Sequence, residues 1–234
     1  MSDGGATRNF MRRMLGNLDQ SARDLGRPNY GAQSVASCLS LYGLCTLVDP
    51  DFVLDVGTAA GASCLSLAYA LKGLGKDPTS QLLTVCVHQG RWWGQGVASN
   101  EKLARDHGIA MRDIPTVDGD FRTVDPPQAV KDGAPTFLFY DIHDYDDGSV
   151  PPSRHLLDVW VPAISRGIVA VHDAYTPKHA DRHPANALHF GLGIVYGRLE
   201  IVPIVEYLNA RRGQLMELPG TWILYFHVED GEVK

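Results

Sequence analysis

The stretch from residue 52 to residue 74 constrains the fold more than any other part of the chain. Its apolar, β-type run Phe52–Val56 is followed by Gly57, and a helical pattern then extends from Ala62 to Leu74. Glycine adopts the left-handed backbone that a tight turn requires. A strand, a small-residue turn and a helix in this order begin a βαβ unit, so we predict an α/β fold.

Strand-like and helical segments alternate along the rest of the chain. Helices are predicted over residues 8–25, 32–47, 62–74, 97–107, 153–164 and 189–199. Strands are predicted over residues 52–56, 82–87, 111–117, 136–140, 168–171, 201–204 and 222–228. This order predicts a doubly wound, mostly parallel sheet of seven strands. Because the last two strands have no helical pattern between them, we expect them to form an antiparallel hairpin at one edge.

The same pattern contains no linker, so we expect a single domain over residues 1–234. In this domain, a helical cap (residues 1–48) precedes an α/β core (residues 49–234).

Composition narrows the classes of function. The formal net charge of −6 argues against non-specific binding to nucleic-acid phosphates. The sequence has neither an apolar stretch of about 18 residues, as a membrane span needs, nor the apolar segment of a signal peptide near its start. Its four cysteines form no C-x-x-C pair and lie in apolar runs, which is typical of reduced thiols. We therefore expect a cytoplasmic protein with neither nucleic-acid nor membrane partners, while a homo-oligomer stays open.

The turn after Phe52–Val56 is a candidate ligand site. Asp55 near the strand end can accept hydrogen bonds, and Ala59 and Gly61 leave room for a ligand beside the backbone. Ligands of open α/β sheets bind at the carboxyl ends of the strands. The turn lacks the Gly-Lys-Ser/Thr of a phosphate loop and the G-x-G-x-x-G of a dinucleotide site.

These residues resemble the first motif of class I S-adenosylmethionine-dependent methyltransferases, an acidic residue followed by three alternating glycines. Asp55, Gly57 and Gly61 match it, with Ala59 in place of the middle glycine. The resemblance implies a Rossmann-like fold in which these residues hold the methionine part of S-adenosylmethionine. Ser63, at the end of the same segment, is a further candidate for binding this cofactor.

The segment after the second strand differs from that family, whereas the segment after the third strand extends the resemblance. Similar methyltransferases carry an acidic residue after the second strand to hold the ribose, whereas this chain has His88 and Gln89, which are weaker acceptors. Cofactor binding that is weak, different or absent therefore stays open. Asp120 follows the third strand, at the position that the resemblance places near the adenine. Trp92 and Trp93 either stack on a ring or pack under the loop.

A cluster of acids and histidines follows two later strands. Asp141, His143 and Asp144 come after residues 136–140, and His172 and Asp173 come after residues 168–171. Adjacent parallel strands would bring these residues to one edge of the sheet. Carboxylate oxygens there suit Mg²⁺ or a similar cation, and a histidine suits a general base.

Both motifs resemble those of metal-dependent sugar and macrolide O-methyltransferases and cephalosporin-hydroxylase-like proteins. The resemblance implies that Asp141 and Asp173 bind the metal, that Asp141 also lies at the cofactor, and that His143 is the base. It implies methyl transfer to a hydroxyl of a small molecule. Since neighbouring residues of a strand point to opposite faces, we expect His172 to face the packed helices.

Other functions stay open. His179 and His183, with His172 and Asp173, have the residue types of a transition-metal site. A metal-dependent hydrolase or oxygenase would use that cluster without S-adenosylmethionine. A degenerate methyltransferase would bind a ligand or partner without chemistry, because fold does not decide function.

Overall fold

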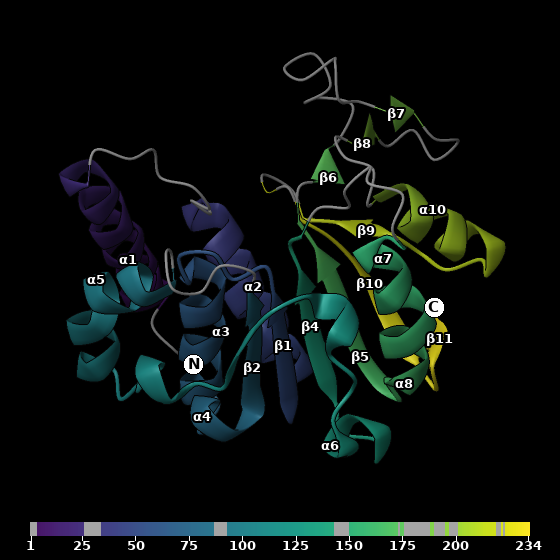
Figure 1. Cartoon of the computed structure of the whole chain (residues 1–234), viewed down its shortest axis with the longest axis horizontal. Helices are drawn as coiled ribbons and strands as arrows, with labels where there is room; N and C mark the ends of the chain where they lie inside the picture. Colours follow the sequence, from purple (N-terminus) through teal and green to yellow (C-terminus); the bar gives the residue numbers. More distant parts are fainter. Residues whose placement is uncertain are drawn as a thin grey trace. The chain divides into compact units, whose positions relative to one another are not determined.

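The computed structural model describes residues 4–25, 34–86, 93–142, 150–172, 174–175, 188–189, 195–196, 201–218, 221 and 223–234 (Figure 1). The chain forms two compact units, Met1–Asp120 and Phe121–Lys234, each with its own helices and strands. The expected border between the helical cap and the α/β core lies inside the first unit, between α2 (Val35–Val48) and β1 (Phe52–Val56).

The first unit alternates helices with parallel strands. Its other elements are α1 (Gly4–Asp24), α3 (Ala62–Gly73), α4 (Pro78–Gln81), β2 (Leu82–Cys86), α5 (Trp93–Asp106), the 3₁₀ helix η1 (Met111–Asp113) and β3 (Thr116–Asp118). β2 pairs in parallel with both β1 and β3. The carboxyl ends of these three strands therefore meet at one edge of the sheet.

Burial explains why these segments adopt these structures. All five residues of β1 are buried, as in a strand covered on both faces. The buried apolar side chains of α1 recur at helical spacing: Phe10, Met11, Met14, Leu15 and Leu18. α2 begins after Ser34, whose hydroxyl accepts a hydrogen bond from the N–H of Ser37 at 3.0 Å.

The strand predicted over residues 111–117 is shorter than expected. Met111–Asp113 is a 3₁₀ turn, and β3 begins only after Pro115. Proline has no N–H to donate to a neighbouring strand. Its carbonyl still accepts from the N–H of Thr84 at 3.0 Å, which aligns β3 with β2.

The second unit carries a parallel strand pair and an antiparallel edge. Its elements are η2 (Phe121–Thr123), α6 (Gln128–Lys131), β4 (Thr136–Tyr140), α7 (Pro152–His155), the π-helix η3 (Leu156–Trp160), α8 (Val161–Ala163), β5 (Arg166–Val171), β6 (Ala174–Tyr175), β7 (Leu188–His189), β8 (Val195–Tyr196), α10 (Ile201–Ala210), β9 (Met216–Glu217), β10 (Leu224–Glu229) and β11 (Glu232–Val233). β4 and β5 are parallel, and β10 is antiparallel to β5, β9 and β11.

The helix predicted over residues 153–164 is present, with a local change of geometry. Its middle, Leu156–Trp160, is π-helical, and it ends at Ala163. Pro162 cannot donate the hydrogen bond of a regular helical turn, and its ring crowds the preceding turn. The wider π turn and the early end of the helix fit that constraint.

The strand predicted over residues 201–204 is wrong, because this segment begins helix α10. Its β-branched residues favour a strand by propensity, but Ile204, Val205 and Leu208 are buried at helical spacing while Glu206 is exposed. α10 packs against α7. Tertiary packing therefore outweighs local propensity here. The antiparallel hairpin of the edge is formed by β10 with β11 instead.

The helix predicted over residues 189–199 is wrong at its described residues, 189, 195 and 196, which lie in strands. β7 and β8, which fall within or beside this range, pair antiparallel, and β8 also pairs with β6. At these described residues, strand pairing therefore outweighs the helical apolar spacing.

The alternation of helices with mostly parallel strands, closed by an antiparallel edge, confirms the predicted α/β class. Among the described residues, no helix is both long and apolar enough to cross a membrane.

Candidate functional site

The turn between β1 and α3 contains three residues in the left-handed region. Their φ angles are 92° for Gly57, 44° for Ala59 and 86° for Gly61. A residue with a Cβ is disfavoured there by about 1–2 kcal/mol. The N–H of Gly57 donates to the carbonyl of Val85 at 2.9 Å, and that of Gly61 donates to the carbonyl of Thr58 at 2.7 Å. The fold itself thus holds this unusual turn.

The buried carboxylate of Asp55 stabilises the turn through hydrogen bonds. Its side chain is fully buried, and its Oδ2 accepts hydrogen bonds from the hydroxyls of Thr58 at 2.9 Å and Ser63 at 3.0 Å. The hydroxyl of Thr84, on β2, lies 3.5 Å from the same oxygen and also contacts that of Thr58. The carboxylate thus joins β1, the turn, α3 and β2. In this geometry the side chains of Asp55 and Ser63 are hydrogen-bonded to each other and hold the shape of the turn.

Cys86 is a residue of this edge that no sequence motif marks. It is the last residue of β2, and its thiol accepts a hydrogen bond from the N–H of Ala59 in the turn. Its carbonyl accepts from the N–H of Gly119 at 3.2 Å, which brings the neighbouring Asp120 to the same edge. The signal that could have found Cys86 is its place at the end of the apolar run of β2.

The thiol of Cys86 is neutral at physiological pH. Burial raises its pKa, the N–H of Ala59 opposes this shift, and the carboxylates of Asp55 and Asp118 raise it further. β2 therefore ends in a neutral side chain. Methyltransferases with a similar first motif have an acidic residue just after the corresponding strand.

Helix α5 packs directly on the turn. A Cβ on Gly61 would lie 2.9 Å from the ring of Trp93, and one on Gly96 would lie 1.7 Å from the carbonyl oxygen of Ala60. We expected Gly61 to leave room for a ligand, but the space beside its Cα holds the indole of Trp93. Of the two interpretations open for this tryptophan, the structure shows packing.

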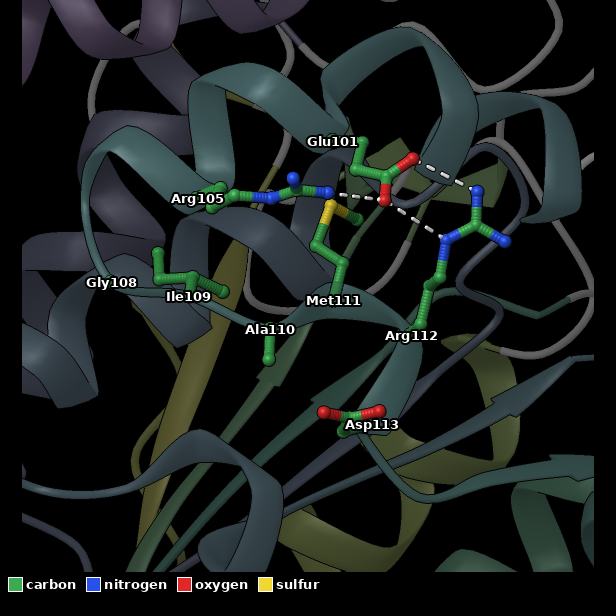
Figure 2. Close-up of a pocket in the computed structure, with 8 residues that line it drawn as sticks. All are labelled: Glu101, Arg105, Gly108, Ile109, Ala110, Met111, Arg112 and Asp113. Atoms are coloured by element: carbon green, nitrogen blue, oxygen red, sulfur yellow. Dashed lines mark hydrogen bonds and ion pairs between the residues drawn. The ribbon is translucent and has the colours of Figure 1, made fainter.

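A hollow of about 310 Å³ lies between the C-terminal half of α5 and residues 108–113 (Figure 2). On its rim, Glu101 accepts hydrogen bonds from Arg105 at 2.7 Å and from Arg112 at 2.9 and 3.2 Å. Met111, which lines the hollow, also reaches the turn, since its Cε lies 3.5 Å from the position of a Cβ on Gly61.

The end of the parallel pair in the second unit brings Asp141 and His172 together. Nδ1 of His172 lies 3.1 Å from Oδ1 of Asp141, and the N–H of His172 donates to the carbonyl of Tyr140 at 3.0 Å. The expectation that His172 faces the packed helices is therefore wrong. β5 ends at Val171, so the alternation of side chains along a strand no longer applies to the next residue.

The other predicted site residues lie outside the described residues. These are His88, Gln89, His143, Asp144, Asp173, His179 and His183. Within the described part of the chain, no group of three or more His, Cys, Asp or Glu side chains is placed to hold a metal ion.

Comparison of the sequence with family models gives no match, and none of the curated proteins matches it either. Solved structures do match along nearly the whole chain. A candidate O-methyltransferase from Klebsiella pneumoniae matches at 14% identity and a TM-score of 0.59, over 98% of this chain and 91% of its own.

Two further matches have methyltransferase cofactors or products bound. The O-methyltransferase TomG from Streptomyces achromogenes, in complex with S-adenosylmethionine, matches at 15% identity and a TM-score of 0.58, over 92% of this chain and 89% of its own. A methyltransferase from Podospora anserina with bound S-adenosylhomocysteine matches at 12% identity and a TM-score of 0.57, over 93% and 87% of the two chains. The chain has the class I methyltransferase fold. The predicted Rossmann-like fold class is thereby confirmed.

Proposed function

We propose that this protein transfers a methyl group from S-adenosylmethionine to a hydroxyl of a small molecule. The observation that carries the proposal is the braced turn Gly57–Gly61 at the carboxyl end of β1, in a chain whose fold matches solved methyltransferases nearly end to end. TomG is in complex with S-adenosylmethionine, and the Podospora protein has S-adenosylhomocysteine bound.

The chemistry of the turn fits the methionine end of the cofactor. α3 begins after Gly61, and among the described residues no side chain caps its first turn. The N–H groups of a helix start attract anions, so they suit the methionine carboxylate. Asp55 would keep the turn in place for this contact, through Thr58 and Ser63.

The ribose and adenine parts of S-adenosylmethionine would contact neutral or partly exposed side chains. Cys86 ends β2 with a thiol that is neutral, and Asp120 is half-buried beyond β3. We propose His88, Gln89 and Asp120 as the contacts at this end, as the resemblance implies. A neutral acceptor binds hydroxyls less strongly than a carboxylate, so we expect moderate cofactor affinity.

When bound, S-adenosylmethionine supplies an electrophilic methyl group on a sulfonium. The protein then has to orient the acceptor hydroxyl towards that methyl and take up its proton. We propose His143 as the base that accepts this proton. Asp141 and Asp173 would hold a divalent cation, whose contribution is to acidify a bound hydroxyl; carboxylate oxygens fit Mg²⁺.

Calorimetric titration with S-adenosylhomocysteine, with and without Mg²⁺, tests the proposal. We expect saturable binding of one molecule per chain. Absence of binding under both conditions would contradict the proposal. Tightly held zinc or iron in such a non-binding protein would favour a metal-dependent hydrolase or oxygenase. Binding without methylation of any hydroxyl acceptor would favour a degenerate binding protein.

A further inference from the structure

Two glycines mark where helix α5 touches the turn. Gly96 is buried, and a Cβ there would overlap the carbonyl of Ala60, at 1.7 Å from its oxygen and 2.6 Å from its carbon. Gly61 faces the ring of Trp93 at 2.9 Å and Cε of Met111 at 3.5 Å, both measured from the position of a Cβ. The close approach of the Ala60 backbone therefore requires glycine at position 96, and the side chain of Trp93 lies directly against Gly61.

The contact falls on the part of the turn that is hardest to maintain. Ala59 has a φ of 44° and precedes Ala60 and Gly61 directly. Backbone in sparsely populated regions persists where the surrounding structure holds it. On one side, the thiol of Cys86 accepts the N–H of Ala59. On the other side, Gly96 and Trp93 of α5 pack against Ala60 and Gly61.

We propose that Trp93 is a positioning residue for the cofactor. Its indole ring, resting on Gly61, keeps the turn in the shape that binds S-adenosylmethionine, and Gly96 allows α5 to come close enough. This inference rests on the proposed function. It predicts that the docking of α5 sets cofactor affinity by holding the turn.

Two glycines of α5 provide a matched pair of variants. Gly94→Ala adds a methyl group where no described atom lies within 4 Å, whereas Gly96→Ala drives a methyl group into Ala60. Overpacking of this kind shifts backbone, so we expect Gly96→Ala to bind S-adenosylhomocysteine at least about tenfold more weakly. Gly94→Ala should bind as the unmodified protein does. Calorimetry measures the affinity, and circular dichroism shows that each variant is folded.

Variants at Trp93 keep the test valid if Gly96→Ala does not fold. Trp93→Ala leaves the turn unsupported and should weaken binding about tenfold, whereas Trp93→Phe keeps a flat ring and should recover most of the affinity. Both titrations are run well below the melting temperature. A purely structural tryptophan would lower the melting temperature in Trp93→Ala and leave the dissociation constant unchanged.

The outcomes separate this inference from the function on which it rests. If the unmodified protein binds S-adenosylhomocysteine, and folded Trp93→Ala and Gly96→Ala bind equally well, the positioning role is wrong and the proposed function stands. If the unmodified protein does not bind, both are overturned. Weakened binding in these two variants, with Gly94→Ala unchanged and Trp93→Phe restored, supports the positioning role.

Discussion

Nδ1 of His172 and Oδ1 of Asp141 lie 3.1 Å apart, and both side chains are mostly buried. Because an ionised carboxylate only accepts hydrogen bonds, this contact assigns the imidazole proton to Nδ1. His172 therefore orients the carboxylate that we propose as a metal ligand. Partners of this kind typically change metal affinity when they are removed.

The first prediction concerns metal binding in the second unit. We expect Mg²⁺ or Mn²⁺ to raise the melting temperature, because a bound cation stabilises the folded state. Asp141→Asn should abolish this rise, and His172→Ala should weaken the apparent metal affinity about tenfold. His227→Ala, at an exposed position on β10, serves as the control. Identical melting curves in metal and in chelator would contradict a cation at this site.

The second prediction concerns the base. His143→Ala should lose about 10²-fold or more in turnover on a hydroxyl acceptor while keeping its affinity for S-adenosylhomocysteine, since a general base acts on the chemical step. The rate of the unmodified enzyme should rise with pH towards neutrality, as the histidine becomes neutral. With Mg²⁺ at saturating concentration for each variant, a larger loss of turnover in His172→Ala than in His143→Ala would show that the wrong histidine is assigned.

The third prediction concerns the turn itself. Gly57→Val should abolish binding of S-adenosylhomocysteine, because a β-branched residue is strongly disfavoured at a φ of 92°. Gly75→Val is the matched control: Gly75 has a φ of 76° at the far end of α3, and no described atom lies within 4 Å of a Cβ there. It should show a comparable loss of stability with unchanged affinity. Equal affinity of folded Gly57→Val and the unmodified protein would refute a ligand site at this turn.

A fourth prediction tests the bracing role of Asp55. Asp55→Ala leaves the buried hydroxyls of Thr58 and Ser63 without their shared acceptor. Thr58 keeps its contacts with the hydroxyl of Thr84 and the carbonyl of residue 55, whereas Ser63 loses the acceptor at 3.0 Å. A buried group left without a partner costs about 1–3 kcal/mol, so urea unfolding should show a clear loss of stability. Affinity for S-adenosylhomocysteine should fall as well. Undiminished stability would mean that the turn does not depend on this carboxylate.

The fifth prediction is a pH dependence of stability through Lys76. Its Nζ lies 2.8 Å from Oδ1 of Asp49 and 3.0 Å from Oδ1 of Asp51, and it donates to the carbonyl of Pro50 at 2.7 Å. Burial lowers the pKa of Lys76, but the hydrogen bonds to Asp49 and Asp51, with their charges, outweigh this effect and raise the pKa overall.

Because the folded pKa lies above the unfolded value of about 10.4, the stabilisation is fully present below that pH and is lost as the pH rises through the folded pKa. Urea unfolding should therefore show a decline in alkali that Lys76→Met lacks. Lys102→Met, which removes an exposed ion pair with Asp106, should leave stability almost unchanged. A decline of the same size in Lys76→Met would point to another group.

Local patterns in the sequence were sufficient for the α/β class and for the position of the candidate site. β1 and β4 have the bounds that their apolar runs predict, and Gly57 and Gly61 have the positive φ that a turn between a strand and a helix demands. These features depend on neighbours a few residues away, which a single sequence displays directly. The same local reasoning failed at α10, where packing against α7 outweighs a β-branched sequence.

What the tertiary structure decided is which side chains meet. The sequence predicts Asp55 as a ligand contact, but in the structure its carboxylate accepts hydrogen bonds from Ser63 and Thr84. Gly61 reads as space for a ligand, but helix α5 places Trp93 there. His172 reads as a core residue, but it meets Asp141, which lies 31 positions earlier in the chain. Such contacts depend on strand register and helix docking between distant segments, and the periodicity within one segment carries no information about them.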